Sequence, residues 1–392
     1  MLQIFLLLVL LACGDPGAER AGEAAPSDDG SFQADPQPVP ETEVAVLPIG
    51  SQAPDFELPG VDGKMYRLAD FAEAEVLVVI FTCNHCPTAQ AYEERIKALV
   101  RDYAEQSVQV VAISPNSPIS LLYEELGYTD LDDDYEAMVI RAEDHEFNFP
   151  YLYDGDDHAA SIPYGPVATP HAYVFDRKRS LRYRGRIDDS EKPGTGQAED
   201  LRAAIDAVLA GEAVANPQTK TFGCSVKWAW KTEYKERVEG EWKNRPVNLQ
   251  TIDRDALADL LRNENSDNLR LINVWATWCG PCIIEYPEFL IMQRMYGARD
   301  FEFVSVSADS PSARENVLEF LEAKESGVPN YLFGEEDKYA LIETIDPDWN
   351  GALPYTLLVE PDGKVVYARQ GAIDPLEMKR AIVEHPLMGR YY

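Results

Sequence analysis

Two stretches of sequence decide the fold, because each carries a run of mostly apolar residues directly into a pair of cysteines. Residues 76–87 read VLVVIFTCNHCP, and residues 269–282 read LRLINVWATWCGPC. Such short runs, rich in β-branched residues, are typical of a central strand that is buried on both faces. Helical sequence follows each cysteine pair, over about 88–103 and 283–296. Each copy is therefore predicted to deliver a Cys-x-x-Cys motif from a buried strand to the start of a helix.

The sequence after each helix follows the same order in both copies. A strand comes first, then a strand opened by X-Pro, a returning strand and a closing amphipathic helix. The predicted ranges are 108–114, 169–175, 181–185 and 198–210 in the first copy, and 301–308, 353–359, 364–371 and 375–384 in the second. This order predicts an α/β fold with two domains, each a mixed central β-sheet flanked by helices.

Composition narrows the class of protein. The 392 residues are 45% hydrophobic, which suits about two or three packed domains. The chain carries 68 acidic and 35 basic residues, a net charge of −33, and phosphate binding requires basic surface. Nucleic acid is therefore not expected as a partner. Because the one long apolar run lies at the N-terminus, a multi-span membrane protein is also excluded.

The N-terminus resembles an export signal. Residues 4–12 are apolar. They are too few to span a bilayer, which needs about 20 residues, but they are typical of a short secretory signal. Residues 1–3 lack the basic charge that usually precedes such a signal. Leu-Leu-Ala before Cys13 resembles a bacterial lipobox, which implies a lipid on that cysteine. We therefore expect a signal peptide at 1–12, then Cys13 and a disordered acidic linker to residue 47. This places the chain on the periplasmic side of the bacterial cell envelope, bound to the membrane through its lipid alone.

The cysteine pairs suit thiol–disulfide exchange. Exchange requires a thiolate, and the unpaired N–H groups and dipole of a helix start lower a thiol pKa there. On this argument Cys83 and Cys279 are the predicted attacking thiols, and Cys86 and Cys282 resolve the mixed disulfide. His85 precedes the resolving cysteine of the first pair and is expected to stabilise the Cys83 thiolate, which would make that couple the more oxidising one.

Both copies resemble the thioredoxin superfamily. The second resembles TlpA-like thiol-disulfide oxidoreductases through NVWATWCGPC at 273–282 and Ala-Leu-Pro at 352–354, over residues 248–392. The first resembles redoxin domains of the AhpC/TSA type through Ala-Pro-Asp-Phe at 53–56 and FTCNHCP at 81–87, over residues 48–212. Residues 213–247, including Cys224, are expected to lie between the domains, and the acidic loop 130–135 looks like an insertion.

The resemblance implies an enzyme that exchanges protein thiols and disulfides without a cofactor, supplied by a membrane or periplasmic electron donor. It also implies a cis-proline opposite each cysteine pair, at Pro170 and Pro354. Glu285 lies one helical turn after Cys282, and in TlpA-like proteins a glutamate there is a candidate proton acceptor, as an alternative to a solvated surface charge. In the first copy Ala89 is expected at the position of Glu285.

Two rival functions remain open at this point. Cys86-Pro87-Thr88 resembles the start of a peroxidatic signature, which would make the first domain a thiol peroxidase. Cys83, Cys86 and His171 would instead form a copper-binding or metallochaperone site if they converged, because thiolates and imidazole suit Cu(I). Cys224 has no partner in sequence; it could resolve a mixed disulfide or ligate a metal, but we expect a buried, inert thiol.

Overall fold

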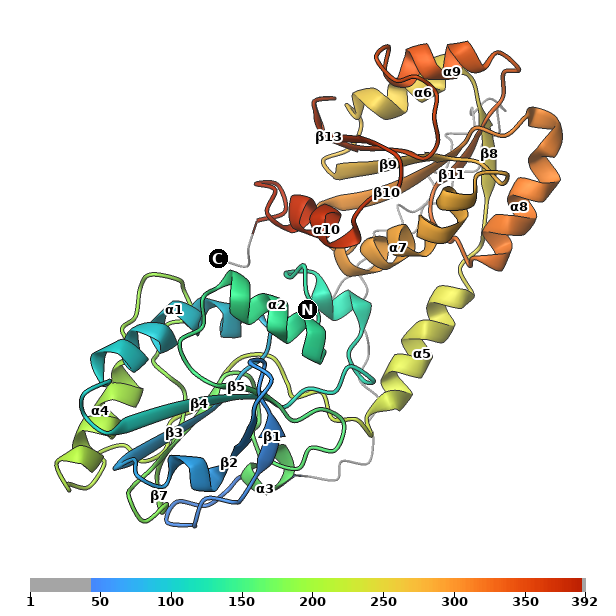
Figure 1. Ribbon diagram of the computed structural model, residues 1–392. Coiled ribbons are helices and arrows are strands. Elements are labelled where there is room, and N and C mark those ends of the chain that lie inside the picture. The colour runs from blue at the N-terminus through green and yellow to red at the C-terminus, as the bar shows by residue number, and fades with distance from the viewer. Residues whose placement is uncertain (1–43, 390–392) are drawn as a thin grey trace, which may run out of the picture. The chain divides into compact units, whose positions relative to one another are not determined.

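The computed structural model describes residues 44–389 as two α/β domains (Figure 1). The expected signal peptide, lipidated Cys13 and most of the acidic linker lie outside the described residues. Within the described residues no helix is both long and apolar enough to cross a membrane. The prediction of two mixed sheets flanked by helices is confirmed.

The first domain is built on a five-stranded sheet of order β5-β4-β3-β6-β7. Strands β3, β4 and β5 are parallel, and β6 and β7 are antiparallel to their neighbours. Its elements are β1 (Glu57–Pro59), β2 (Met65–Arg67), β3 (Val76–Phe81), α1 (Pro87–Asp102), β4 (Val108–Ser114), α2 (Tyr135–Asp144), β5 (Tyr151–Tyr153), α3 (Ser161–Tyr164), β6 (His171–Phe175), β7 (Leu181–Gly185) and α4 (Glu199–Leu209).

Alternate residues of β3 supply the two faces of the first core. Val76, Val78 and Ile80 pack with the apolar side chains of α1, α2 and α4. Leu77 and Val79 face the other way, toward the cluster that contains β1 and α3. Both faces are covered, which explains why β3 is an unbroken apolar run rather than an alternating one.

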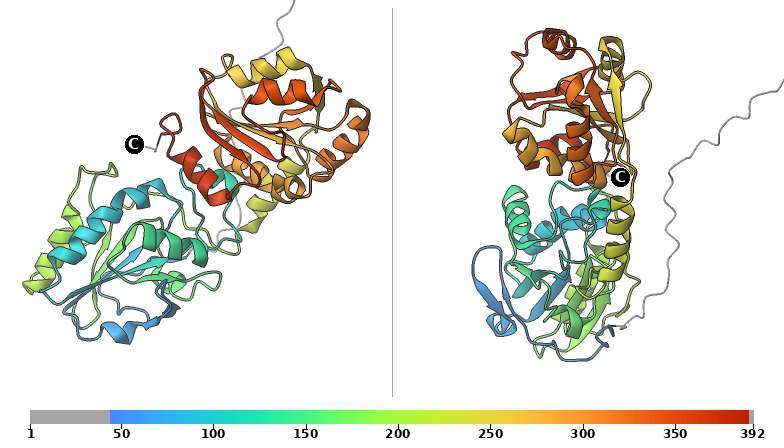
Figure 2. Two further views of the ribbon diagram at one scale, coloured as in Figure 1. Left: turned by 45° about the horizontal axis from the view of Figure 1, so that its top comes forward. Right: turned by 90° about the vertical axis from the view of Figure 1, so that its right-hand side faces the viewer.

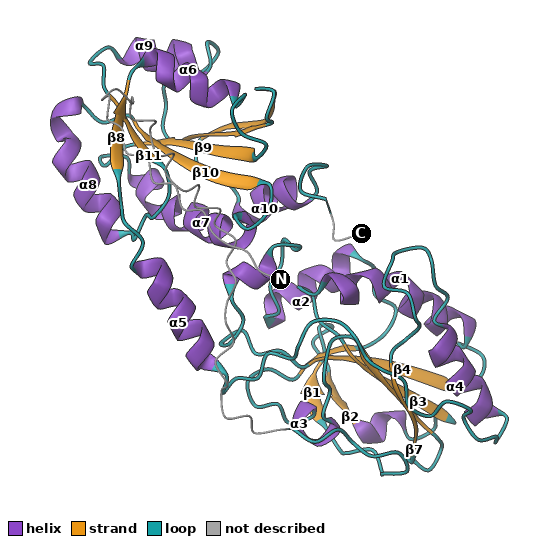
Figure 3. Ribbon diagram, turned by 180° about the vertical axis from the view of Figure 1, so that it is seen from behind, coloured by secondary structure: helices purple, strands orange, loops and turns teal. Residues whose placement is uncertain are grey.

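The second domain has a six-stranded sheet of order β13-β12-β9-β10-β11-β8. Figure 3 labels β8, β9, β10 and β11 of this sheet. Strand β9 is parallel to β10 and antiparallel to β12. After α5 (Thr232–Lys243), the elements are β8 (Leu249–Ile252), α6 (Arg254–Arg262), β9 (Leu269–Trp275), α7 (Gly280–Tyr296), β10 (Phe301–Ser307), α8 (Arg314–Ala323), β11 (Asn330–Phe333), α9 (Lys338–Ile345), β12 (Tyr355–Val359), β13 (Val365–Gln370) and α10 (Pro375–Val383).

Helices cover both faces of the second sheet as well, which the two views of Figure 2 show from further sides. Leu269 and Leu271 of β9 pack with α7, α8 and α10. Ile272 and Val274 pack with α6 and α9 on the opposite face. In both domains the strand before the cysteines is thus fixed from two sides, so the loop that follows it starts from a rigid position.

The structure confirms the predicted central strands and the order of elements after them. Helix α1 begins at Pro87 and α7 at Gly280, one and three residues earlier than the sequence predicted. The peptide bonds before Pro170 and Pro354 are cis in the structure, as the resemblance implied. The sequence did not predict strands β1, β2, β5, β8 and β11 or helices α2, α3, α5, α6, α8 and α9.

Candidate active sites

Strand register gives the two domains a common reference. In the first sheet the residue after the cis-proline, His171, pairs with Phe81. In the second sheet the residue after the cis-proline, Tyr355, pairs with Val274. Phe81 and Val274 therefore occupy equivalent positions, and the cysteines can be compared by counting forward from them.

Counted in this way, the cysteine equivalent to Cys279 is Cys86, not Cys83. Each lies five positions beyond its reference residue, and each is the N-cap of its helix with extended backbone. Cys83 precedes the helix by four residues, so the prediction that it occupies the helix start is wrong. The sequence pattern misled because Cys-x-x-Cys has the same spacing whether the helix begins at its first or its second cysteine.

The electrostatics of the first site also single out Cys86. Burial opposes its thiolate, but hydrogen bonds from the thiols of Cys224 and Cys83 and the charge of His85 lower the Cys86 pKa well below its ordinary value. Burial, followed by the hydrogen bond with Cys86, raises the pKa of Cys83 well above its ordinary value. Cys83 and Cys86 are free thiols and are almost fully buried. Of the two cysteines of this motif, Cys86 is therefore the one whose thiolate its surroundings favour.

His85 forms a buried pair with Asp133. The imidazole Nδ1–H donates to Asp133 Oδ2 over 2.5 Å, and both side chains are at most 2% exposed. Burial disfavours the imidazolium, but the charge and hydrogen bond of Asp133 outweigh it and raise the His85 pKa. The predicted role of His85 in tuning a thiolate stays a prediction, but its charge acts on Cys86 rather than on Cys83.

Asp133 is a site residue that the sequence analysis missed. Its Oδ1 accepts the backbone N–H groups of Asn84 and His85 at 2.9 and 3.0 Å, and its Oδ2 accepts Asn116 Nδ2 at 2.7 Å. The acidic loop that looked like an insertion therefore orders the cysteine loop. A run of aspartates just before a helix could have signalled this, because one of them, Asp134, caps α2 and leaves its neighbour facing inward.

The second site holds a disulfide between Cys279 and Cys282. Cys279 is 6% exposed and Cys282 is fully buried one turn inside α7, while the neighbouring Trp278 is 70% exposed. Asp309 fixes the preceding loop by accepting the backbone N–H and the hydroxyl of Thr277 at 2.9 and 2.7 Å. The disulfide is thus almost fully buried, but it lies at the start of α7 beside an exposed apolar side chain.

Glu285 is not a solvated surface charge. It is 6% exposed; its Oε2 accepts the Ile373 N–H at 3.0 Å, and its Oε1 accepts Asn273 Nδ2 at 3.3 Å. Burial raises its pKa, although both hydrogen bonds act in the opposite direction. A positioned carboxyl with a raised pKa can take up and release a proton during thiol–disulfide exchange.

The expected equivalence of Ala89 and Glu285 is wrong. With Cys86 aligned to Cys279, Ala89 corresponds to Cys282, and both are fully buried. Glu285 corresponds to Tyr92, whose hydroxyl donates to Asp188 Oδ1 at 3.0 Å. The first domain therefore lacks a cysteine inside its helix, and any partner for Cys86 must come from elsewhere.

The alternative copper site of Cys83, Cys86 and His171 does not assemble within the described residues. His171 Nδ1 accepts the Val167 N–H at 3.3 Å and lies 3.1 Å from the Tyr173 hydroxyl. Both contacts of the imidazole are therefore with residues within four positions of His171 along the chain. Within residues 44–389 the group that could hold a metal is Cys83, His85 and Asp133, whose ligand atoms lie within 4.8 Å of one another. The His85–Asp133 hydrogen bond already accounts for that proximity.

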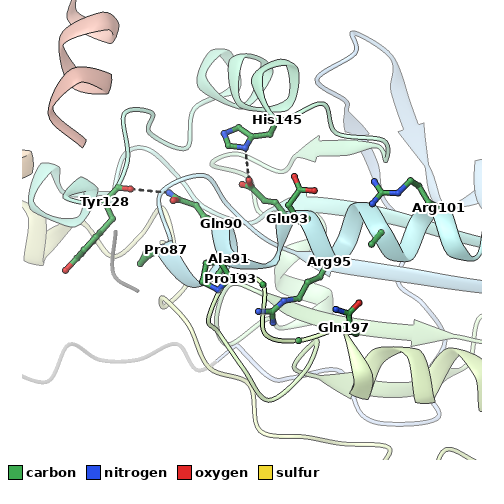
Figure 4. A pocket seen from close by; sticks show the side chains of 14 residues that line it. Pro87, Gln90, Ala91, Glu93, Arg95, Arg101, Tyr128, His145, Pro193 and Gln197 are labelled. Atoms are coloured by element: carbon green, nitrogen blue, oxygen red, sulfur yellow. Dashed lines mark hydrogen bonds and ion pairs between the residues drawn. The ribbon is translucent and has the colours of Figure 1, made fainter. Parts of the chain in front are cut away.

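A cavity of about 440 Å³ lies along α1, next to the first site (Figure 4). Pro87 and Gln90 line it from the first turn of the helix, and Gln90 Nε2 donates to the Tyr128 carbonyl at 3.4 Å. The lining does not include any cysteine. The cavity therefore does not give a small molecule direct access to the thiols.

Two curated relatives share part of this sequence. The chain is 28% identical over 144 residues to the thiol:disulfide interchange protein DsbE of Allochromatium vinosum, covering 36% of this chain and 67% of that protein. It is 30% identical over 106 residues to the thiol-disulfide oxidoreductase ResA of Oceanobacillus iheyensis, covering 26% of this chain and 50% of that protein. The chain thus spans half to two thirds of the length of these relatives.

Among solved structures, an uncharacterized conserved protein from Geobacillus kaustophilus is 38% identical, with a TM-score of 0.41, and the match covers 46% of this chain and 92% of that one. The AhpC/TSA family model matches twice, at residues 49–184 and 250–368, which together make up more than half of the sequence. Each match covers one central sheet with its cysteines. The chain belongs to the AhpC/TSA family.

Proposed function

We propose that this chain is an exported thiol–disulfide oxidoreductase with two redox centres, one in each domain. The proposed domain limits are residues 48–212 and 248–392. In the second domain Cys279 attacks a substrate disulfide and Cys282 resolves the mixed disulfide. In the first domain the attacking thiol is Cys86.

One observation carries the proposal: the Cys279–Cys282 disulfide at the start of α7, with Glu285 buried behind it. Helix N–H groups stabilise the thiolate that leaves when this disulfide is reduced. Glu285 is placed to exchange the proton that the second thiol must gain or lose. The exposed Trp278 offers an apolar contact for a protein substrate. The similarity to the thiol:disulfide interchange protein of A. vinosum and the thiol-disulfide oxidoreductase of O. iheyensis supports the same reaction class.

The test is reduction of insulin disulfides by the full chain with dithiothreitol as donor. Cys279→Ser, made in a Cys86→Ser background, should abolish the reaction. Cys282→Ser in the same background should accumulate a mixed disulfide through Cys279, because its resolving thiol is missing. A Cys279→Ser chain that still reduced insulin at the parent rate would disprove the assignment.

A thiol peroxidase is the second candidate for the first domain. The observation in its favour is that Cys86 is a helix N-cap with a lowered pKa and is followed by Pro87, in a member of the AhpC/TSA family. Peroxide consumption by a Cys279→Ser/Cys282→Ser chain, lost on Cys86→Ser, would establish it. A chain that exchanges disulfides without consuming peroxide would leave the oxidoreductase assignment alone.

Export and attachment are part of the proposal. Residues 1–12 act as a signal peptide, and Cys13 carries the lipid that holds the protein on the periplasmic side of the bacterial envelope. Its partners there are protein thiols or disulfides and a membrane or periplasmic electron donor. Membrane fractionation should find the parent chain with the membrane and Cys13→Ser in the soluble fraction; equal distribution of both would contradict the anchor.

A further inference from the structure

Cys224 lies against the first active site. Its backbone carbonyl accepts the Thr169 N–H at 2.9 Å, in an antiparallel bridge between these two residues. Its own N–H points at Cys86 Sγ over 3.4 Å. The backbone of Thr169, directly before the cis-proline, is thus paired with a segment of this same chain, and that segment presents a cysteine.

Gly223 allows this close approach. Its φ is +130°, and a Cβ added there would lie 2.0 Å from the Thr169 carbonyl oxygen. Any larger residue would push the segment away from the active-site strand. The glycine before Cys224 therefore has a local reason: it lets the cysteine reach the site.

Three thiols meet at this point. Cys83, Cys86 and Cys224 share one small apolar cluster with Ala89. Cys86 Sγ lies 3.2 Å from the Thr169 carbonyl oxygen, and Cys83 Sγ lies 3.1 Å from the Thr169 hydroxyl. Cys224 is the most exposed of the three. Because Ala89 leaves no cysteine inside the helix, Cys224 occupies a place from which a second thiol can act on Cys86.

We propose that Cys224 is a third redox cysteine of the first domain, which resolves a mixed disulfide on Cys86 to form a Cys86–Cys224 disulfide. This inference rests on the proposed thiol–disulfide exchange at Cys86. It replaces the expectation of an inert thiol. The external reactant is a protein or low-molecular-weight disulfide, R–S–S–R′.

The exchange balances in two steps. The Cys86 thiolate attacks R–S–S–R′, forming Cys86–S–S–R and releasing R′S⁻, which takes up a proton. The Cys224 thiol then loses its proton and attacks Cys86 Sγ, and RS⁻ leaves. Two protein thiols are oxidised to one disulfide, and one external disulfide is reduced to two thiols.

The hydrogen bond with Cys86, and then burial, raise the pKa of Cys224. Once Cys86 is in a mixed disulfide, its negative charge is gone. The first of these causes is then removed, so the pKa of Cys224 falls and its attack is favoured after the first step, although burial still raises that pKa.

The experiment uses the full chain with Cys13, Cys279 and Cys282 changed to serine. Oxidised glutathione is added to the reduced protein, and glutathione release and peptide linkages are followed by mass spectrometry after acid quench. With Cys83→Ser added, only Cys86 and Cys224 remain. We expect two glutathiones per chain and a Cys86–Cys224 linkage. Because a neighbouring thiol reacts intramolecularly, the second release should be about 10²-fold faster, or more, than with Cys224→Ser also present.

Two further chains serve as controls, one matched variant and the parent. Gly223→Ala, in the Cys83→Ser chain, keeps the thiol but displaces the segment, so it should also slow the second release. The parent with all three thiols should yield the Cys86–Cys224 linkage without any substitution in the first domain.

The outcomes separate the two proposals. One glutathione released, with glutathionylated Cys86 persisting and no Cys86–Cys224 linkage in the parent, would overturn the role of Cys224 while the exchange at Cys86 stands. No glutathione released from any variant would overturn both.

Discussion

The two domains place different residues directly before the same N-cap cysteine. In the first domain it is His85, which is 1% exposed and paired with Asp133; in the second it is Trp278, which is 70% exposed. Each loop is held by a buried aspartate that accepts the backbone N–H two residues before the cysteine. The scaffold is therefore the same, while charge and access to the thiol differ.

The second thiol also differs between the domains. In the second domain it lies one turn inside the helix, at Cys282, so the centre is complete within one motif. In the first domain that position is Ala89, and the nearby thiols are Cys83, on the loop before the helix, and Cys224, far along the chain. The comparison teaches that one helix start can form a redox centre in two ways: with both thiols in one motif beside an exposed side chain, or with thiols from segments far apart in the sequence.

The largest expected effect tests whether the N-cap cysteine is the thiolate in both domains. In a chain with Cys279 and Cys282 changed to serine, thiolate absorbance near 240 nm should show one group titrating well below the ordinary range. Cys86→Ser should remove it, and Cys83→Ser should keep it, because only Cys86 gains from the helix start and from His85.

The control for this experiment is Cys224→Ala, which should keep the group but raise its pKa, since one hydrogen-bond donor is lost. A low-pKa thiolate that disappeared with Cys83→Ser instead would restore the order first predicted from the sequence, and would break the equivalence of the two domains.

The next effect concerns the two aspartates. Asp133→Asn leaves the buried His85 without its charge partner, so we expect a loss of about 3–5 kcal/mol in the free energy of unfolding. Asp309→Asn, whose side-chain hydrogen-bond partners are neutral, should cost about 1–3 kcal/mol. Calorimetric melting of the two full-length variants checks the difference, and equal losses would contradict a charged pair.

The pH dependence follows from the pKa directions. His85 has a raised pKa. Its contribution to the free energy of unfolding is therefore complete below about pH 6.5 and is lost as pH rises through its folded pKa. Asp133 has a lowered pKa, because the charge of His85 outweighs the opposing effect of burial. Its contribution to the free energy of unfolding is therefore present above about pH 4 and is lost in acid. The cost of Asp133→Asn should therefore be greatest between about pH 4 and 6.5. A cost that grew above pH 8 would be inconsistent with this pair.

Local patterns were sufficient for much of the fold. The apolar runs of β3 and β9 located the central strands, and the prolines located the strands beside them. The site was harder, because the identity of the N-cap cysteine depends on where α1 begins, and Pro87 starts it one residue after Cys86. Asp133 and Cys224 reach the site through long-range packing, 48 and 138 residues from their partners, which local periodicity does not encode.

A smaller effect concerns the proton path in the second domain. Glu285→Gln should slow insulin reduction about 10²-fold and raise the pH optimum, because water then replaces a positioned base. The fold should remain, since glutamine keeps an acceptor for the Ile373 N–H. Tyr92→Phe, at the equivalent position of the first domain, should leave the rate of the second site unchanged. An unaltered pH–rate profile for Glu285→Gln would leave this residue a structural role only.

The smallest effect is a difference in reduction potential between the sites. His85 stabilises the Cys86 thiolate, and stabilising the reduced form makes a couple more oxidising. One unit of thiol pKa is about 1.4 kcal/mol, or about 30 mV for two electrons. The first site should thus be more oxidising by several tens of millivolts, and electrons would run from Cys279/Cys282 toward Cys86.

The test is a redox titration of each variant against glutathione. The substitution His85→Asn should lower the reduction potential of the first site by about 30 mV. Trp278→His should raise that of the second site by less, because water screens an exposed charge. If the two sites of the unaltered chain titrated at one potential, His85 would not set the direction of electron flow, and the difference between the domains would be one of access alone.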